Sequence, residues 1–574
     1  MINMAAKTGI AGWAALWVAA STLAAAPAIF PLKDIRPGQH GTGRTVFSGS
    51  RVEDFQVEIL GVLENIGPRQ SIILARLSGG PLAQTGVMQG MSGSPVYIDG
   101  KLIGAVALGF ELAKEPICGI RPIEEMLRVE PEPKQQRASL DAGPRGQFLS
   151  GETRITEIAT PVSFSGFTAA TLEHFAPQLR LLGMDPRQGV SGGGRLPEAL
   201  GDPKKLEPGS MISVQLLSGD MNVGADGTVT MIDGKKIYAF GHRLLAAGGT
   251  ELPFARSEVL ALLPALSSSF KISQPREWMG TITEDRNSAI SGLTGQRARM
   301  IPIEIKMGAD TYRMGMIQDR VLTPLVAQMA VFSAIDATAR TVGAASYTVR
   351  GQINFDSGSI KLDNVYSGDV SVSTSASLGI ATPLSYALAS GFDALKLKNI
   401  ALEIGTLDQR RQMQIADVVA PRRVRPGEEI EIAVVLSGEN GTETTRRVHY
   451  QVPVGAETGA LYLTAGDATA ANLTHLQTAY GAAFRSPEQV LGMLNGLRTN
   501  TSAYLRVWRS GAAYTVEGRE LPDPPASVAM ILGRSQPGGP NALNVRGAEI
   551  AEIEVASGGS VVTGSKTIQI EVRE

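Results

Sequence analysis

Short alternations of apolar and polar residues, each closed by turn residues, recur along most of the chain. In DFQVEILGVL the side chains of Phe55, Val57 and Ile59 alternate with polar ones, a period of two that predicts a strand with one buried face. A longer apolar run, VYIDGKLIGAVALGF, is interrupted at Asp99-Gly100, a pair that favours the positive φ angles of a tight hairpin turn. The pattern predicts a mostly β protein with few helices.

The chain is too long for one hydrophobic core, because 574 residues exceed the usual size of a domain. Residues 131–207 are rich in Pro, Gly and charge, which is typical of a linker with a small insert. Residues 300–410 predict a β-rich unit whose strands include GDVSVSTSASLGI, with one helix near LTPLVAQMAVFSAIDAT. Pro-Gly and Asn-Gly turns between alternating strands predict an immunoglobulin-like sandwich in residues 411–470. A later helix is expected to begin at the N-cap Ser486.

The first 28 residues have the layout of a secretory signal. One lysine precedes an apolar stretch of about fifteen residues from Ile10, and small residues run from Ala24 to Ala28. Cleavage after Ala26 or Ala28 would export the protein to the periplasm or the extracellular space. The alternative is an uncleaved membrane anchor, because the apolar stretch is close to the ~18 residues of a spanning helix. Membrane contact is expected only in that case.

Charge and cysteine content exclude several classes of function. The 53 basic and 55 acidic side chains give a net charge of -2, so the broad positive field of a nucleic-acid-binding protein is absent. Cys118 is the one cysteine, which rules out an intrachain disulfide and a cysteine-based metal site, and a buried structural role is expected for it. The five histidines lack metal-ligand spacing, so we expect no metal and no cofactor.

The motif GMSGSP, residues Gly90 to Pro95, is the strongest chemical signal. A serine hydroxyl becomes a nucleophile when a base takes its proton and donors hold the oxyanion that forms. Glycines beside Ser92 allow the amides of Gly90 and Ser92 to point into one pocket. A serine in G-x-S-G-x-P followed by strand, tight turn and strand is the arrangement around the nucleophile of chymotrypsin-like peptidases. The alternative is a Gly/Ser turn with no chemistry.

The best candidate for the base is His242, which follows an apolar strand in KKIYAFGH at a glycine that would expose the ring. His40, in RPGQHGTGRTVF, is the second candidate. His174 lies on an amphipathic stretch, His449 in the predicted sandwich and His475 at the start of a helix, where structural or surface roles are commoner. Taken by itself, His242 is equally typical of a structural histidine at the end of a strand, whose ring bonds a carbonyl oxygen.

Three segments resemble the SpoIVB peptidase family, serine peptidases that act in bacterial envelope signalling and can process themselves. These segments are EDFQVEILGV, LAQTGVMQGMSGSPVYIDGKLIGAV and GTVTMIDGKKIYAFGH. The resemblance implies that Ser92 matches the family's nucleophile and that His242 matches its general base. It also implies a chymotrypsin-like double β-barrel. The motif around His242 departs from the family in having Arg243 after the histidine.

Two further departures concern order and the third catalytic group. The histidine segment precedes the serine segment in the sporulation peptidase, whereas Ser92 comes first here, so the order is permuted; a triad is defined by geometry and tolerates this. The family's acid lies about fifteen positions before its serine, where Ser78 and Gly79 stand in this chain. The orienting role would then pass to another acid such as Glu251 or Asp285, to a carbonyl, or to nothing.

The expected protein is an exported serine endopeptidase of SpoIVB type that cleaves envelope proteins or itself and has a regulatory role. A non-catalytic peptidase-like scaffold of the envelope is the alternative, and an esterase using the same pair is a third possibility. The expected units are a signal peptide (1–28), a Ser-containing peptidase half (29–130), a linker and small insert (131–207), a His-containing peptidase half (208–299), a β-rich domain (300–410), an immunoglobulin-like sandwich (411–470) and a C-terminal α+β module (471–574).

Overall fold

The computed structural model describes residues 28–574 except 68, 111–112, 129–147, 151–152, 159–160, 190, 267, 339–344, 369–370, 408, 481–483, 517–518, 523–524 and 533–541. The predicted signal segment therefore lies outside the described residues, apart from Ala28. Strands hold 53% of the residues and helices 19%, so the predicted mostly β fold is confirmed. None of the helices within the described ranges is both long and apolar enough to cross a membrane.

The first barrel is a closed antiparallel ring. Its strands are β1 (His40–Ser48), β2 (Arg51–Gly67), β3 (Gln70–Ser78), β4 (Pro95–Ile98), β5 (Lys101–Phe110) and β6 (Ile117–Pro122). The pairing order β1-β2-β3-β6-β5-β4 returns to β1, because β4 pairs with both β5 and β1. Phe55, Val57 and Ile59 face its core as their alternation predicts, and Asp99 and Gly100 form the hairpin turn with positive φ. The helices α1 (Leu82–Thr85) and α2 (Ile123–Met126) are short, and β7 (Phe148–Ser150) and β8 (Thr153–Glu157) extend the sheet from β5.

The second barrel repeats this architecture. Its strands are β11 (Met211–Gly219), β12 (Asn222–Asp233), β13 (Lys236–Ala239), β14 (Gly248–Leu263), β15 (Phe270–Arg286) and β16 (Ala289–Thr294). The order β11-β12-β13-β16-β15-β14 closes where β14 pairs with β11. Part of the segment expected to be an insert joins this sheet, because β9 (Pro161–Ser165) pairs with β12 and β10 (Asp185–Gln188) pairs with β9, with α3 (Ala169–Leu181) between them.

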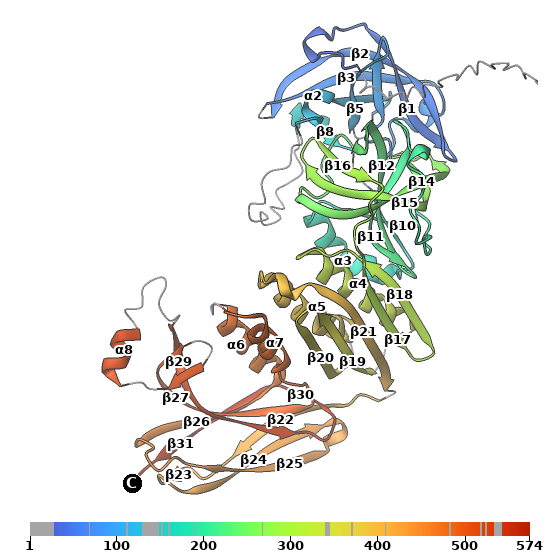
Figure 1. The fold of residues 1–574 in the computed structure, drawn as a ribbon. Coiled ribbons are helices and arrows are strands. Elements are labelled where there is room, and N and C mark those ends of the chain that lie inside the picture. Colours follow the sequence, from blue (N-terminus) through green and yellow to red (C-terminus); the bar gives the residue numbers. More distant parts are fainter. Residues whose placement is uncertain are drawn as a thin grey trace, which may run out of the picture.

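The two barrels are in direct contact, one above the other in Figure 1. The long hairpin of β14 and β15 reaches onto the first barrel, where Val259 pairs with Gly49 and Phe270 pairs with Gln89. The N-terminal barrel-like fold followed by a sandwich thus agrees with the predicted fold class.

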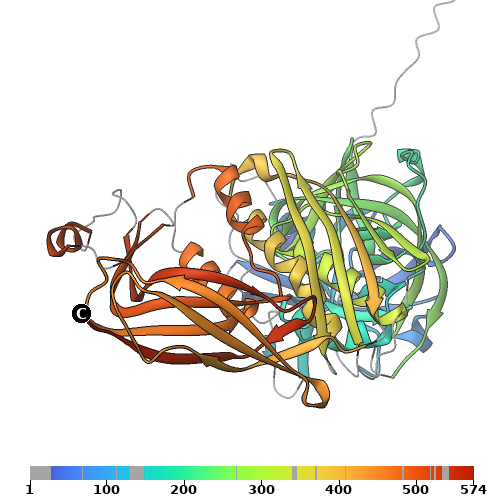
Figure 2. The same cartoon turned by 90° about the horizontal axis from the view of Figure 1, so that it is seen from below.

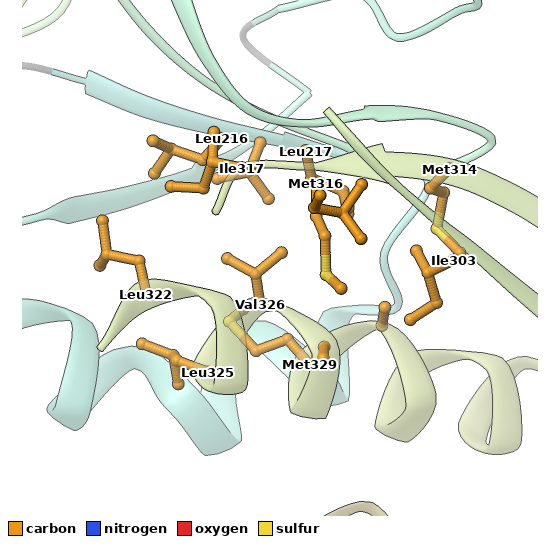
Figure 3. Packing of buried hydrophobic residues seen from close by; sticks show 14 of the residues in the cluster. Leu216, Leu217, Ile303, Met314, Met316, Ile317, Leu322, Leu325, Val326 and Met329 are labelled. Carbon is orange, nitrogen blue, oxygen red and sulfur yellow. The ribbon is translucent and has the colours of Figure 1, made fainter. Parts of the chain in front are cut away.

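A mixed α/β layer continues the sheet of the second barrel. Its strands are β17 (Ile301–Met307), β18 (Asp310–Met316), β19 (Ala345–Phe355), β20 (Gly358–Gly368) and β21 (Leu397–Leu407), joined to the barrel by β18 on β11. Helix α4 (Leu322–Thr338) is the predicted helix, and Figure 3 shows its Val326 and Met329 pointing towards Leu217 and Met316 of the sheet.

A second helix of this layer, α5 (Val372–Ala389), replaces the strand expected from GDVSVSTSASLGI. That expectation was wrong because the buried residues recur at a helical spacing rather than in alternation. The buried positions of this period are Val372, Ala376, Ile380, Leu384 and Ala387. Helix α5 packs on α4, so tertiary contacts offset the modest helix propensity of its serines and threonines.

The C-terminal part is a two-sheet sandwich with its own core (Figures 1 and 2). One sheet has the order β25-β24-β22-β30 and the other β23-β31-β26-β27-β28, with β29 on β27. The strands are β22 (Gln412–Val419), β23 (Arg423–Val424), β24 (Glu429–Gly438), β25 (Glu443–Gln451), β26 (Gly459–Asp467), β27 (Ser502–Val516), β28 (Arg519–Pro522), β29 (Ala542–Ala556), β30 (Val561–Thr563) and β31 (Ser565–Val572). The helices are α6 (Ala468–Tyr480), α7 (Pro487–Asn495) and α8 (Ala526–Leu532), and Ser486 caps α7 as predicted.

Candidate active site

The Ser92 turn connects α1 to β4 and is pressed against the second barrel. Gly90 and Gly93 have φ angles of 90° and 95°, which favour glycine. A Cβ atom on Gly93 would lie 2.0 Å from the Thr228 carbonyl oxygen and 2.6 Å from the Phe240 nitrogen. Glycine is therefore required at position 93, because the backbones of β12 and of the segment after β13 come too close for any side chain.

Strand β12 holds the turn through three hydrogen bonds. The Thr228 amide donates to the Ser92 carbonyl oxygen at 2.9 Å. The Thr228 hydroxyl donates to the Gly90 carbonyl oxygen at 2.8 Å, and the Thr230 hydroxyl donates to that of Gly93 at 2.7 Å. Residues two apart on a strand share a face, so both hydroxyls come from one side of β12. The conformation of the serine turn thus depends on the barrel that carries His242.

Two amides of the turn are left available for an acceptor. The amides of Met91, Gly93 and Ser94 donate to the carbonyl oxygens of Met88, Val106 and Met91. The amides of Gly90 and Ser92 donate to no group within the described ranges. These are the two amides expected to hold an oxyanion, and donors without an acceptor suit that role.

His242 follows a tight turn at the end of β13. Phe240 and Gly241 both have a φ of 70°, and the His242 side chain is buried, with 1% of the residue exposed. Its Nδ1 lies 2.7 Å from the Arg243 carbonyl oxygen, which accepts, so Nδ1 carries the hydrogen. In the neutral ring this leaves the lone pair on Nε2, the tautomer that a general base needs. The aromatic ring of Phe240 packs beside the imidazole, with centroids 5.9 Å apart.

The serine and histidine turns adjoin each other, but their side chains are not hydrogen-bonded to one another. Gly93, next to Ser92, contacts the Phe240 backbone two residues before His242. The Ser92 hydroxyl is fully buried and has no hydrogen-bond partner among the described residues. Catalytic hydrogen bonds are often long in unliganded enzymes. Both side chains are thus buried at the junction of the barrels, and the Ser92 hydroxyl does not bond the His242 ring.

The other histidines lie in different surroundings. His40 is exposed at the start of β1, and His174 in α3 stacks on Phe332 with ring centroids 5.0 Å apart. His449 is exposed on β25, and His475 lies in α6, where burial first of all lowers the pKa of its imidazole. His242 is the histidine whose turn reaches the serine turn.

The two acids considered for the third role lie in different surroundings. Glu251 is exposed on β14. Asp285 is buried in β15, and burial raises the pKa of its carboxyl while bonds from backbone amides oppose the rise. Its oxygens accept from the amides of Leu244 at 2.8 Å, Leu245 at 2.7 Å and Ala247 at 3.2 Å. Asp285 therefore fixes the loop after His242, and the Arg243 carbonyl orients the ring.

A buried lysine beside the serine turn was not identified from the sequence. Lys271 of β15 is 2% exposed, and burial lowers the pKa of its amine to about 7. Its Nζ donates to the Thr45 hydroxyl oxygen at 2.7 Å. A sequence signal does exist, because Lys271 and Ser273 occupy inward positions of an alternating strand, where a charged residue is unusual.

A buried ion pair supports the histidine turn from the first barrel. The Arg121 guanidinium lies 3.3 Å from the Glu125 carboxylate, and its Nε donates to the Gly241 carbonyl oxygen at 3.4 Å. Glu125 also accepts from the Ser71 amide at 2.7 Å.

Cys118, on β6, is buried as expected, and desolvation raises the pKa of its thiol, which disfavours the nucleophilic thiolate.

The family model of the SpoIVB peptidase S55 matches residues 1–127 of the chain. The matched part includes the first barrel and the Ser92 turn, and His242 lies outside it. Neither the comparison with curated proteins nor that with solved structures found a match. The first 127 residues, which hold the barrel that carries Ser92, are therefore similar to the SpoIVB peptidase S55 family.

Proposed function

We propose that this protein is an exported serine endopeptidase in which Ser92 is the nucleophile and His242 the general base. The observation that carries the proposal is the junction of the two barrels. There the Ser92 turn lies against the segment leading to His242, and the amides of Gly90 and Ser92 have no other acceptor among the described residues. A nucleophile, a base and two amide donors are the parts that acyl transfer needs.

The reaction would follow from these positions. The Ser92 oxygen attacks the peptide carbonyl carbon while its proton passes to His242 Nε2, and the two amides stabilise the oxyanion. The imidazolium then gives its proton to the leaving amine, and water releases the acyl group by the same steps. The Arg243 carbonyl carries no full charge, so it stabilises the imidazolium less than an aspartate does. Because Ser78 stands where the family has its acid, we infer a slow peptidase, since an aspartate-to-amide change in a Ser-His-Asp triad lowers turnover by ~10⁴.

The substrate class is an envelope protein or the chain itself. Slow turnover and buried reacting groups suit a regulatory enzyme that cleaves few targets better than a degradative one. Because Ser92 and His242 are both buried, access would require the serine turn to move away from β12. Exclusion of water from the closed site would also protect the chain from indiscriminate activity.

A non-catalytic envelope scaffold is the second candidate. The observation that favours it is the same burial, together with the unengaged Ser92 hydroxyl. In that case the Gly-rich turn serves only to dock the first barrel on the second.

Labelling with a fluorophosphonate separates the two candidates. We expect the probe to label the wild-type protein and the Ser48→Ala control, whose serine is exposed on β1, but not Ser92→Ala. His242→Ala should reduce labelling strongly. Incubation of the same four proteins should show self-cleavage that depends on both Ser92 and His242. Equal labelling of wild type and Ser92→Ala, or none of either, would refute the enzyme and favour the scaffold.

A further inference from the structure

We propose that Lys271 is a positioning residue that braces the Ser92 turn at both of its ends and so keeps the Gly90 and Ser92 amides in place. The inference rests on the proposed peptidase function for its catalytic consequence. The bracing of the turn itself is inferred from contacts of Lys271 that do not depend on activity.

The side-chain stem of Lys271 contacts the first end of the turn. A Cβ atom on Gly90 would lie 3.2 Å from Lys271 Cδ, 3.4 Å from Cγ and 3.5 Å from Cβ, so the stem lies along the Gly90 backbone. The Lys271 amide also donates to the Gln89 carbonyl oxygen at 3.2 Å. Strand β15 thereby supports the residue whose amide is the first of the two available donors.

The amine of Lys271 reaches the second end of the turn through a hydroxyl. Lys271 Nζ donates to Thr45 Oγ1 at 2.7 Å, and the Ser94 hydroxyl donates to the same oxygen at 3.1 Å. All three side chains are buried. Ser92 therefore lies between two points, Gly90 and Ser94, that are both tied to Lys271. The hydrogen bonds from Thr228 and Thr230 of β12 hold the same turn. Contacts from two strands, β12 and β15, therefore fix its conformation together.

Lysine is a costly residue for mere space-filling at this position. The structure gives Lys271 no ion pair with any carboxylate in the described part of the chain. The buried acid Asp226 bonds Ser273, two residues further along β15. A methionine would fill similar volume without the desolvation penalty, whereas it would lose the bond to Thr45. A buried, unpaired and perturbed lysine next to a candidate nucleophile is typical of a functional site.

The test uses the full-length chain with Lys271→Met, Thr45→Val and the double variant, and Lys101→Met, whose lysine is exposed, as the matched control. Hydrogen exchange of the segment 88–94 measures the bracing, and the rate of Ser92 labelling by a fluorophosphonate measures its consequence. We expect exchange in 88–94 to be about tenfold faster and labelling about tenfold slower in each single variant, the effect of one lost buried hydrogen bond. The double variant should match the singles within about twofold, because both changes break one chain of contacts.

Each outcome decides between the two levels of the proposal. Unchanged exchange in 88–94 upon Lys271→Met, or independent and multiplying effects of Lys271→Met and Thr45→Val, would overturn the brace. Faster exchange with unchanged labelling would overturn its role in positioning. Faster exchange in a protein that is never labelled at Ser92 would sustain the brace and refute the peptidase function. Thermal melting of each variant shows whether the whole barrel has been lost, in which case Lys271→Arg provides the comparison.

Discussion

Replacing Lys271 by methionine should stabilise the protein at neutral pH and remove a specific pH dependence of its stability. Burial lowers the pKa of the Lys271 amine from its ordinary 10.5 to about 7 in the folded state. Below pH 7 the amine is protonated in both states, so the folded protein carries the full penalty of a buried charge. Between pH 7 and 10.5 the folded state releases the proton while the unfolded state keeps it, so stability rises with pH.

The size of this effect follows from the interval between the two pKa values. At 1.36 kcal/mol per pH unit, the difference between 10.5 and about 7 corresponds to ~5 kcal/mol of unfolding free energy. The difference between wild type and Lys271→Met should therefore change by ~4 kcal/mol from pH 6 to pH 10.5, because the unfolded amine is only half titrated at the upper limit. The lost bond to Thr45 and the gain of apolar volume add an offset that does not depend on pH.

Urea unfolding at constant ionic strength between pH 6 and 10.5 measures this difference. The fluorescence of Trp278, buried in β15 of the second barrel, is a local reporter when the other tryptophans are replaced by phenylalanine. Titrations of other groups cancel between the two proteins, because they are common to both. A difference that stays constant within about 1 kcal/mol across this range would refute the assignment of a depressed pKa to Lys271.

Three further predictions concern the barrel junction and its neighbours. Gly93→Ala should prevent the barrels from docking, with loss of cooperative thermal melting, whereas Gly61→Ala, with open space around its Cβ, should melt like wild type. Glu125→Ala should lower the free energy of unfolding by about 3–5 kcal/mol in urea titrations, because it leaves the buried Arg121 guanidinium without its carboxylate. Glu58→Ala, which breaks an exposed pair, should lower it by at most about 1 kcal/mol. Equal losses in the two variants would contradict this prediction. Cys118 should react with a thiol reagent at the rate of unfolding, and fast labelling of the native protein would show that the first barrel opens.

Much of the local structure follows from short-range pattern. The alternation around Phe55, the Asp99-Gly100 turn and the Ser486 cap are each determined by residues a few positions apart, and each is found as predicted. Helix α5 was missed because a run of serine, threonine and valine resembles a strand until its period of burial is known.

The arrangement of the candidate site could not be predicted from local sequence patterns. The approach of the segment after Phe240 to Gly93 depends on how two closed barrels pack, which no local sequence feature encodes. Lys271 has the character of a surface residue in the sequence, and its burial arises only when β15 is placed against the Ser92 turn. The bond between His242 Nδ1 and the Arg243 carbonyl oxygen is a contact with the backbone, which the identity of residue 243 does not predict.

The strand order of the sandwich has a consequence for how the protein is made. Strand β22 pairs in parallel with β30, and β23 with β31. Strands near residue 415 therefore cannot complete their pairing until residues beyond 560 have been synthesised. Both barrels, by contrast, are complete once residue 294 has emerged. The barrels can therefore mature early during synthesis, while the first sandwich strands stay with open edges until the last ones arrive. Newly made chains would be most exposed to misassembly in that interval, and the sandwich is the part that would need protection.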